Sequence, residues 1–133
     1  MILVDSSVLI DVIEAKPDWK YWSAAQLDKH SGSDGLAINA IIYAEISRTF
    51  ASAESQNGFL NAVGIRVLPI PNEAAFAASR AYLAYRAVGG HKTSTLPDFF
   101  IGAHADAGGY PLLTRDAKRI RTYFPRVTLI TPD

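Results

Sequence analysis

The chain has 133 residues, of which 49% are hydrophobic and 20% charged, a composition that favours a folded globular protein over a disordered one. It contains no cysteine, which excludes disulfide bonds, thiolate catalysis and cysteine-ligated zinc. The formal net charge is zero, which argues against a protein that coats nucleic acid by neutralising phosphates. We expect one domain over residues 1–133, soluble and cytoplasmic, with no export signal and no membrane association.

Short apolar runs alternate with helical patterns along the chain. The apolar runs predict five strands, at residues 2–4, 36–38, 66–68, 112–113 and 128–130. The helical patterns predict helices at residues 8–14, 17–30, 54–64, 73–88 and 97–108, with two more that begin near residues 40 and 117. This alternation is typical of an α/β fold with a central parallel sheet of about five strands, flanked by helices.

The first predicted strand ends at an acidic residue. Asp5 follows the apolar run, and Ser6 and Ser7 are positioned to cap the helix at residues 8–14. The junction therefore places an acid at the carboxyl end of a buried strand.

A second acid lies on the apolar face of a helix. Ile42, Glu45, Ile46 and Thr49 follow one another at the spacing of a single helical face. An isolated charge in an apolar setting is very costly, so the Glu45 carboxylate must be paired, neutralised or bound to a metal.

The segment from Leu96 to Asp116 places two more carboxylates at the start of consecutive helices. Asp98 follows Pro97 in the first turn of one helix, and Asp116 follows the strand at 112–113 and precedes the next helix. In an open parallel sheet, ligands bind at the carboxyl edge of the strands, where we expect both acids to lie. A purely structural role at the start of each helix is the alternative.

Clustered carboxylates repel one another, so each raises the pKa of its neighbours unless a cation compensates them. Oxygen ligands favour hard cations, which predicts Mg²⁺, with Mn²⁺ able to substitute. Such an ion activates water and stabilises charge on a phosphodiester. The sequence therefore predicts an acidic metal site composed of Asp5, Glu45, Asp98 and Asp116.

Four segments resemble the PIN domain, and specifically VapC-type toxins of type II toxin–antitoxin systems. They are ILVDSSVLID, IIYAEI, LPDFFIGAHA and LLTRDAKRI, and they occur in the order and spacing of that family. The resemblance implies a PIN-like three-layer sandwich. It also implies an Mg²⁺- or Mn²⁺-dependent endoribonuclease, a cognate VapB-type antitoxin as partner, a homodimer, and a toxin–antitoxin hetero-oligomer.

The resemblance also assigns roles by position. The acidic quartet of the family matches the four acids above, with Asp5 and Asp98 as principal metal ligands and with Glu45 and Asp116 completing the site, directly or through water. Thr114 matches the hydroxyl residue of the last motif, and Ser6 matches the polar residue after the first acid.

Contacts with substrate are expected from basic residues near this edge. His91 and Lys92 are predicted to lie in a loop beside the site, and Arg115 and Lys118 belong to a basic patch over residues 115–126. A solvated helix face is the alternative reading of that patch.

Two other interpretations remain. Histidine acid–base catalysis by His30, His91 and His104 is possible in principle, but their spacing gives it no support. A non-catalytic scaffold of the same fold that binds RNA or protein is the second. Trp19, Tyr21 and Trp22 either belong to the core or form a partner surface.

Overall fold

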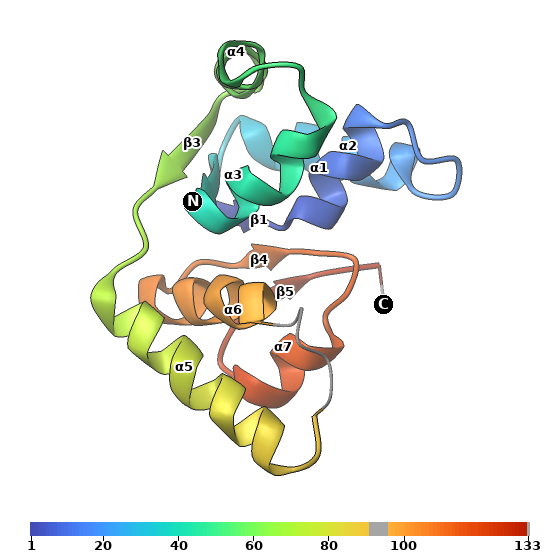
Figure 1. Cartoon of the computed structure of the whole chain (residues 1–133). Coiled ribbons are helices and arrows are strands. Elements are labelled where there is room, and N and C mark those ends of the chain that lie inside the picture. Colours follow the sequence, from blue (N-terminus) through green and yellow to red (C-terminus); the bar gives the residue numbers. More distant parts are fainter. Residues whose placement is uncertain (91–95, 133) are drawn as a thin grey trace.

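The computed structural model describes residues 1–90 and 96–132 (Figure 1). The strands of this part of the chain are β1 (Ile2–Val4), β2 (Leu36–Asn39), β3 (Ile65–Leu68), β4 (Leu112–Leu113) and β5 (Leu129–Ile130). The helices are α1 (Ser6–Ile13), α2 (Lys20–Ser31), α3 (Ala40–Ile46), α4 (Ala53–Val63), α5 (Asn72–Ala87), α6 (Leu96–Gly108) and α7 (Lys118–Tyr123), and the 3₁₀ turn η1 (Ser47–Thr49) follows α3. The predicted alternation of strands and helices is confirmed.

The five strands form one parallel sheet in the order β3-β2-β1-β4-β5. Strand β1 lies at its centre, where Ile2 is paired with Leu36 of β2 and Leu3 with Leu112 of β4. The chain first moves from β1 toward β3, then returns to add β4 and β5 on the other side of β1. The direction of winding therefore reverses between β1 and β4. Folds of this kind bind ligands beyond the carboxyl ends of the strands at such a reversal.

The reversal also explains the layers. Crossovers between parallel strands are right-handed, so the connections on the two sides of β1 pass over opposite faces of the sheet. Figure 1 shows α1 to α4 on one side of the sheet and α5 to α7 on the other. The predicted parallel α/β sandwich is confirmed.

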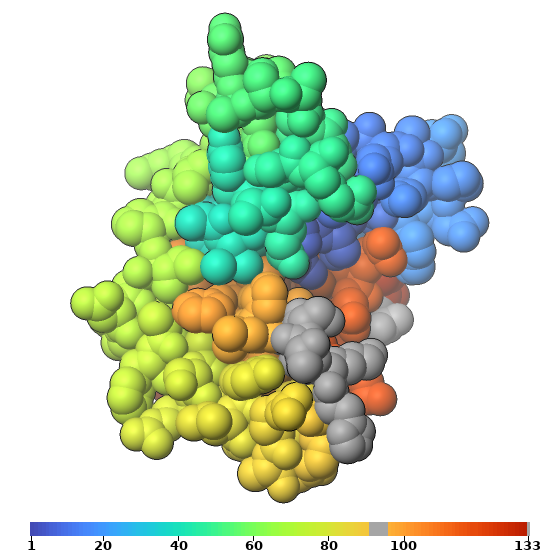
Figure 2. Space-filling model, viewed as in Figure 1, coloured from blue at the N-terminus to red at the C-terminus, as the bar shows by residue number. Residues whose placement is uncertain are grey.

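The core lies on both faces of the central strands. Every residue of β1, β2 and β4 is buried, as is typical of strands covered by helices on both sides. On the second face, Phe99 of α6 is fully buried among aromatic rings of α5, of α7 and of the residue after α7, namely Tyr82, Tyr85, Tyr123 and Phe124. Figure 2 shows α5 covering one flank of the molecule.

Two helix starts differ from the prediction. Asp5, rather than Ser6 or Ser7, caps α1, because its carboxylate accepts a hydrogen bond from the backbone N–H of Ser6 and the helix begins at that residue. Helix α2 begins at Lys20, three residues after Pro17, because residues 17–19 form a turn. The end of α4 is confirmed: Gly64 has a φ of 81°, a left-handed conformation that favours glycine.

None of the helices over residues 1–90 and 96–132 combines the length and the apolar character needed to cross a membrane.

Candidate functional site

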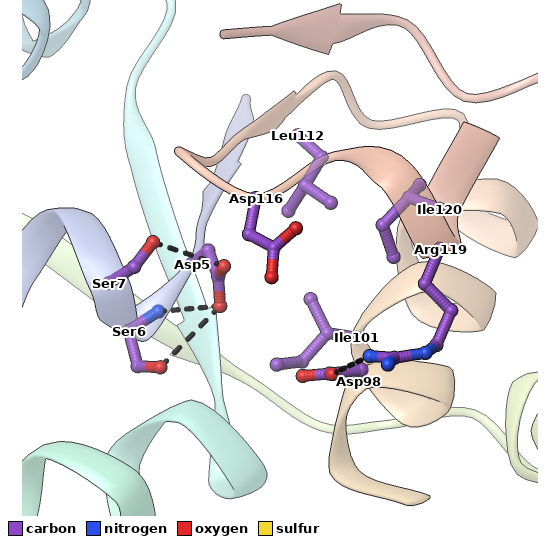
Figure 3. A pocket seen from close by; sticks show the side chains of 9 residues that line it. All are labelled: Asp5, Ser6, Ser7, Asp98, Ile101, Leu112, Asp116, Arg119 and Ile120. Atoms are coloured by element: carbon purple, nitrogen blue, oxygen red, sulfur yellow. Dashed lines mark hydrogen bonds and ion pairs between the residues drawn. The ribbon is translucent and has the colours of Figure 1, made fainter. Parts of the chain in front are cut away.

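A cavity of about 170 Å³ lies at the carboxyl edge of the sheet, where β1 and β4 end. Its walls come from both halves of the chain, and they are Asp5, Ser6, Ser7, Asp98, Ile101, Leu112, Asp116, Arg119 and Ile120. Figure 3 shows the carboxylates of Asp5 and Asp116 directed toward the same space, with Asp98 on the opposite wall. Three of the four predicted acids therefore meet at the predicted edge.

Asp5 is held rigidly. One of its oxygens accepts a hydrogen bond from the Ser6 backbone N–H at 2.8 Å. The other accepts hydrogen bonds from the Thr114 hydroxyl at 2.7 Å and the Ser7 hydroxyl at 3.2 Å. Because β1 pairs directly with β4, the residue after each strand is brought beside the other, although Asp5 and Thr114 are 109 residues apart.

Thr114 also orients the turn that carries Asp116. Its hydroxyl oxygen accepts a hydrogen bond from the Asp116 backbone N–H at 3.1 Å, and the Thr114 side chain is fully buried. Asp116 itself is exposed at the rim of the cavity. Thr114 therefore links the positions of the two acids, and its supporting role in the site stays a prediction.

Asp98 is paired with a cation. Its Oδ2 accepts a hydrogen bond from Nη1 of Arg119 at 2.7 Å, and 43% of the Asp98 side chain is exposed. Helix α6 presents Asp98 in its first turn, and α7 supplies Arg119. The Asp98 carboxylate is therefore turned toward α7.

Glu45 is not one of the lining residues, but it lies near enough to three of them, Asp5, Ser6 and Asp98, for them to act on its carboxyl group. Its Oε1 is buried and has no hydrogen-bond partner among the described residues. Helix α3, which carries it, begins at Asn39, whose side chain caps the helix through the backbone N–H of Ile42 at 3.0 Å. A buried carboxylate oxygen that lacks a donor is costly and is the kind of atom that a cation satisfies.

Burial raises the pKa of the carboxyl groups of Asp5, Glu45 and Asp98. Their mutual repulsion raises these pKa values further: Asp5 acts on both Glu45 and Asp98. Hydrogen bonds from Thr114, Ser6 and Ser7 oppose the rise at Asp5, the Ser6 side chain opposes it at Glu45, and Arg119 opposes it at Asp98. The site therefore carries more negative charge than its own residues compensate.

These residues fit a hard divalent cation by chemistry, and their present arrangement is not yet a coordination shell. The donors are all carboxylate oxygens, and Glu45 contributes an unsatisfied one. Over residues 1–90 and 96–132, however, no three acidic or histidine side chains are grouped closely enough to hold a metal ion. The pairing of Asp98 with Arg119 accounts for part of this, since it directs one carboxylate to a guanidinium.

The basic patch at residues 115–126 is largely neutralised by partners from elsewhere in the chain. Three of its arginines have carboxylate partners: Arg115 with Asp11, Arg119 with Asp98, and Arg126 with Asp106. Lys118 is exposed on a second hollow that adjoins the acidic cavity. The patch is therefore not a uniform phosphate-binding face.

Arg115 is paired with a buried aspartate of α1. Its Nη2 and Nε bind the two oxygens of Asp11, at 2.9 and 2.5 Å, and its guanidinium lies 5.0 Å from the ring centre of Trp19. The Asp11 side chain is fully buried and also accepts a hydrogen bond from Ser23 at 2.7 Å. A buried carboxylate therefore engages two nitrogens of the Arg115 guanidinium, whose side chain is 28% exposed, and its predicted contact with substrate stays a prediction.

The remaining predicted residues separate into two groups. His91 and Lys92 lie outside the described residues. His30 binds Asp34 at 2.9 Å, whereas His104 is buried and its Nδ1 lies 3.0 Å from Nδ2 of Asn39. Burial lowers the pKa of His104. These structural partners give histidine catalysis no support.

The aromatic residues of the second predicted helix differ in burial. Trp19 and Trp22 are partly buried and pack edge to face with ring centres 6.1 Å apart, and Trp22 packs against the core. Tyr21 is 78% exposed.

Sequence reasoning missed Ser7, Asp11 and Arg119. Asp11 shares the apolar face of α1 with the buried Val8, so the argument applied to Glu45 would have identified it as a carboxylate in need of a partner. Ser7 is adjacent to Ser6 and was considered only as a cap. For Arg119 the sequence carries no distinguishing signal among its basic neighbours.

Comparison with known proteins places this geometry in a family. The sequence matches the family model described as PIN domain over residues 2–125. No functionally curated protein matches the sequence.

Solved structures of similar fold include three bacterial assemblies. The VapBC2 complex of Rickettsia felis, bound to a DNA fragment from its promoter, has 19% identity, a TM-score of 0.74 and coverage of 100% of both chains. A toxin–antitoxin complex from Klebsiella pneumoniae has 21% identity and a TM-score of 0.71, and the match covers 100% of this chain and 98% of the other. VapBC-1 from nontypeable Haemophilus influenzae has 17% identity, a TM-score of 0.72 and coverage of 98% of each chain. Since these likenesses establish the fold and the family model spans residues 2–125, the chain belongs to the PIN domain family.

Proposed function

We propose that this protein is a metal-dependent endoribonuclease that hydrolyses RNA phosphodiester bonds and acts as the toxin of a toxin–antitoxin pair. The observation that carries the proposal is the acidic cavity at the winding reversal, which three carboxylates line and a fourth, at Glu45, adjoins with an unsatisfied buried oxygen. PIN domains are generally nucleases, and this chain has an acid at every position of the predicted quartet.

The proposed metal site uses Asp5 and Asp98 as principal ligands, with Glu45 and Asp116 binding directly or through water. Mg²⁺ is the proposed ion and Mn²⁺ its substitute, because both prefer carboxylate and water oxygens. When bound, the ion supplies an activated water and offsets the charge that develops on the phosphodiester.

The chain's own residues hold this machinery in place. Ser6, Ser7 and Thr114 orient the two oxygens of Asp5, so that this carboxylate presents one fixed geometry to the cavity. The hydroxyl of Thr114 also fixes the backbone of Asp116. Preorganised ligands lower the cost of binding, because less motion is lost when the ion arrives.

The toxin assignment is supported by the similar structures. One is described as a toxin–antitoxin complex, and another as a member of the VapBC family of toxin–antitoxin systems. We propose a VapB-type antitoxin as partner, a homodimer that assembles with it into a hetero-oligomer, and a cytoplasmic location. The fold common to those assemblies and this chain is the basis of this proposal.

The test is cleavage of a mixed pool of structured RNA by purified protein, with Mg²⁺ or Mn²⁺ compared with EDTA. We expect cleavage that needs the metal and that Asp98→Asn reduces by at least about a hundredfold, since it removes a principal ligand. The matched control is Asp106→Asn. Asp106 lies on the same helix and is also paired with an arginine, Arg126 at 2.9 Å, but it does not line the acidic cavity.

Each outcome separates the interpretations. Loss of cleavage in Asp98→Asn with retention in Asp106→Asn supports the proposed site. Cleavage that survives EDTA contradicts metal dependence. RNA binding without cleavage, independent of metal, would instead support the non-catalytic scaffold.

A further inference from the structure

Arg119 lies between the acidic cavity and a second hollow. The second hollow has a volume of about 400 Å³ and is called here the α7 groove; it is lined by Tyr85, Asp116, Lys118, Arg119, Thr122 and Tyr123. Among residues 1–90 and 96–132, only Asp116 and Arg119 belong to the walls of both hollows. A guanidinium at this place can reach either an acid in the cavity or a ligand in the groove.

In this structure, Arg119 is paired with an acid of the cavity. Its Nη1 donates to Oδ2 of Asp98 at 2.7 Å, while its guanidinium carbon lies 5.5 Å from the ring centre of Tyr85. The side chain is 22% exposed. The Tyr85 ring therefore supports the guanidinium from the groove side, through a cation–π contact that survives small shifts of the arginine.

Three arginines of residues 115–126 are paired with aspartates. Of these three pairs, the one between Arg119 and Asp98 opens onto the acidic cavity. Arg115 is bound to a carboxylate with no exposed surface, and the partner of Arg126 lies outside the cavity. Asp98 is 43% exposed, so water can solvate both partners when they separate. Pairs of this exposure contribute little net stability, and the Asp98–Arg119 pair can therefore exchange partners at low cost.

Asp98 has two competing demands. As a proposed metal ligand it must offer its oxygens to a divalent cation, and a guanidinium on the same carboxylate repels that cation. In the α7 groove, the exposed Lys118 lies beside Tyr85 and Tyr123, whose partly buried rings pack on each other and on Phe99. An exposed cation beside an aromatic wall is suited to the backbone of a single nucleic acid strand.

We propose that Arg119 is an exchangeable counter-cation, which neutralises Asp98 until a divalent metal displaces it into the α7 groove. There it joins Lys118 in binding the phosphate backbone of RNA. The metal thus creates a phosphate-binding arginine at the same moment as it completes the acidic site. Arg119 is a substrate-binding residue in this scheme, and the inference rests on the proposed function.

The first experiment measures Mn²⁺ affinity by calorimetry, without RNA or turnover. We expect Arg119→Gln to bind Mn²⁺ roughly tenfold more tightly than the wild type, because a competing positive charge is removed. The matched control Arg126→Gln also loses an arginine bound to an aspartate of α6, and its affinity should stay within about twofold. Equal affinities for wild type and Arg119→Gln would overturn the inference.

The second experiment needs no variant. Phenylglyoxal, which modifies accessible guanidinium groups, is applied to the wild-type protein in EDTA and in saturating Mn²⁺, and labelled arginines are identified by mass spectrometry. We expect labelling of Arg119 to increase several-fold with Mn²⁺, while that of Arg126, 81% exposed, is unchanged. Labelling of Arg119 that does not respond to Mn²⁺ would contradict the exchange.

A third measurement tests the ligand. Fluorescence anisotropy with a short single-stranded RNA in Ca²⁺, its integrity checked on a gel, should show binding that the ion strengthens in wild type and not in Arg119→Gln. If Ca²⁺ strengthened RNA binding equally in both proteins, the role of Arg119 in the groove would be refuted. Mn²⁺ affinity that Asp98→Asn leaves unchanged would refute the proposed metal site itself, a result distinct from failure of the exchange.

Discussion

The buried pair between Asp11 and Arg115 gives the sharpest prediction about stability. Asp11 has no exposed surface, and its only donors among the described residues are the Arg115 guanidinium and the Ser23 hydroxyl. Replacing Arg115 by Met leaves a carboxylate buried with one neutral donor. Breaking a buried ion pair from one side costs about 3–5 kcal/mol of unfolding free energy.

Replacing the acid of this pair should cost less unfolding free energy than replacing the arginine. In Asp11→Asn the unpaired group is Arg115, whose side chain is 28% exposed and can be solvated by water. The loss is then that of hydrogen bonds to a charged group, about 1.5–3 kcal/mol. The double variant should be less destabilised than the sum of the two single variants, by about 1–3 kcal/mol, because it leaves no buried charge without a partner.

Urea denaturation, followed by far-UV circular dichroism and by tryptophan fluorescence, measures these differences. Trp19 lies against the Arg115 guanidinium, so its fluorescence also reports local changes, and agreement between the two probes is needed for a two-state analysis. A cost below about 1 kcal/mol for Arg115→Met would refute the reasoning, because that is the value of an exposed ion pair. So would strict additivity in the double variant.

Two further predictions concern packing and pH. Gly102→Ala should destabilise the protein by about 1–3 kcal/mol in thermal melts, because the added Cβ would lie 2.5 Å from the Phe124 ring. The control is Gly58→Ala on α4, which should be neutral or stabilising because the added Cβ would meet no neighbouring atom within 4 Å. Burial raises the folded-state pKa of Glu45, so the protonated form is favoured on folding and stability is lost as pH rises through that pKa. In EDTA, Glu45→Gln should therefore match the wild-type melting temperature near pH 4 and exceed it at pH 7; an equal or lower value at pH 7 would contradict the burial argument.

The fold was largely predictable because its signals are local. Each buried strand is a short apolar run bounded by turn residues, and Gly64 marks a helix end through a conformation that few other residues adopt. The order of strands and helices then restricts the sheet to a parallel one. Asp5 and Asp116 were placed correctly because residues that follow parallel strands meet at one edge.

The partners of charged side chains were not predictable, because they depend on contacts far apart in sequence. Arg115 and Arg119 stand four residues apart on the same short segment, yet one binds Asp11, 104 residues away, and the other binds Asp98. The capping residue of α1 was predicted wrongly for a different reason. Aspartate and serine are equally good caps, and the sequence has three such residues in succession, Asp5, Ser6 and Ser7.

The central position of β1 has a consequence for synthesis on the ribosome. Strand β1 must wait for β4, because the bond from Thr114 to Asp5 and the pairing of Leu3 with Leu112 require segments more than a hundred residues later. Until that point a nascent chain lacks the lining residues Asp116, Arg119 and Ile120, and the bond that orients Asp5 from Thr114. Parallel pairings of such long sequence separation also fold slowly. A polypeptide under synthesis therefore has no complete site until β4 and α7 have been translated, and whatever that site does begins only after that point.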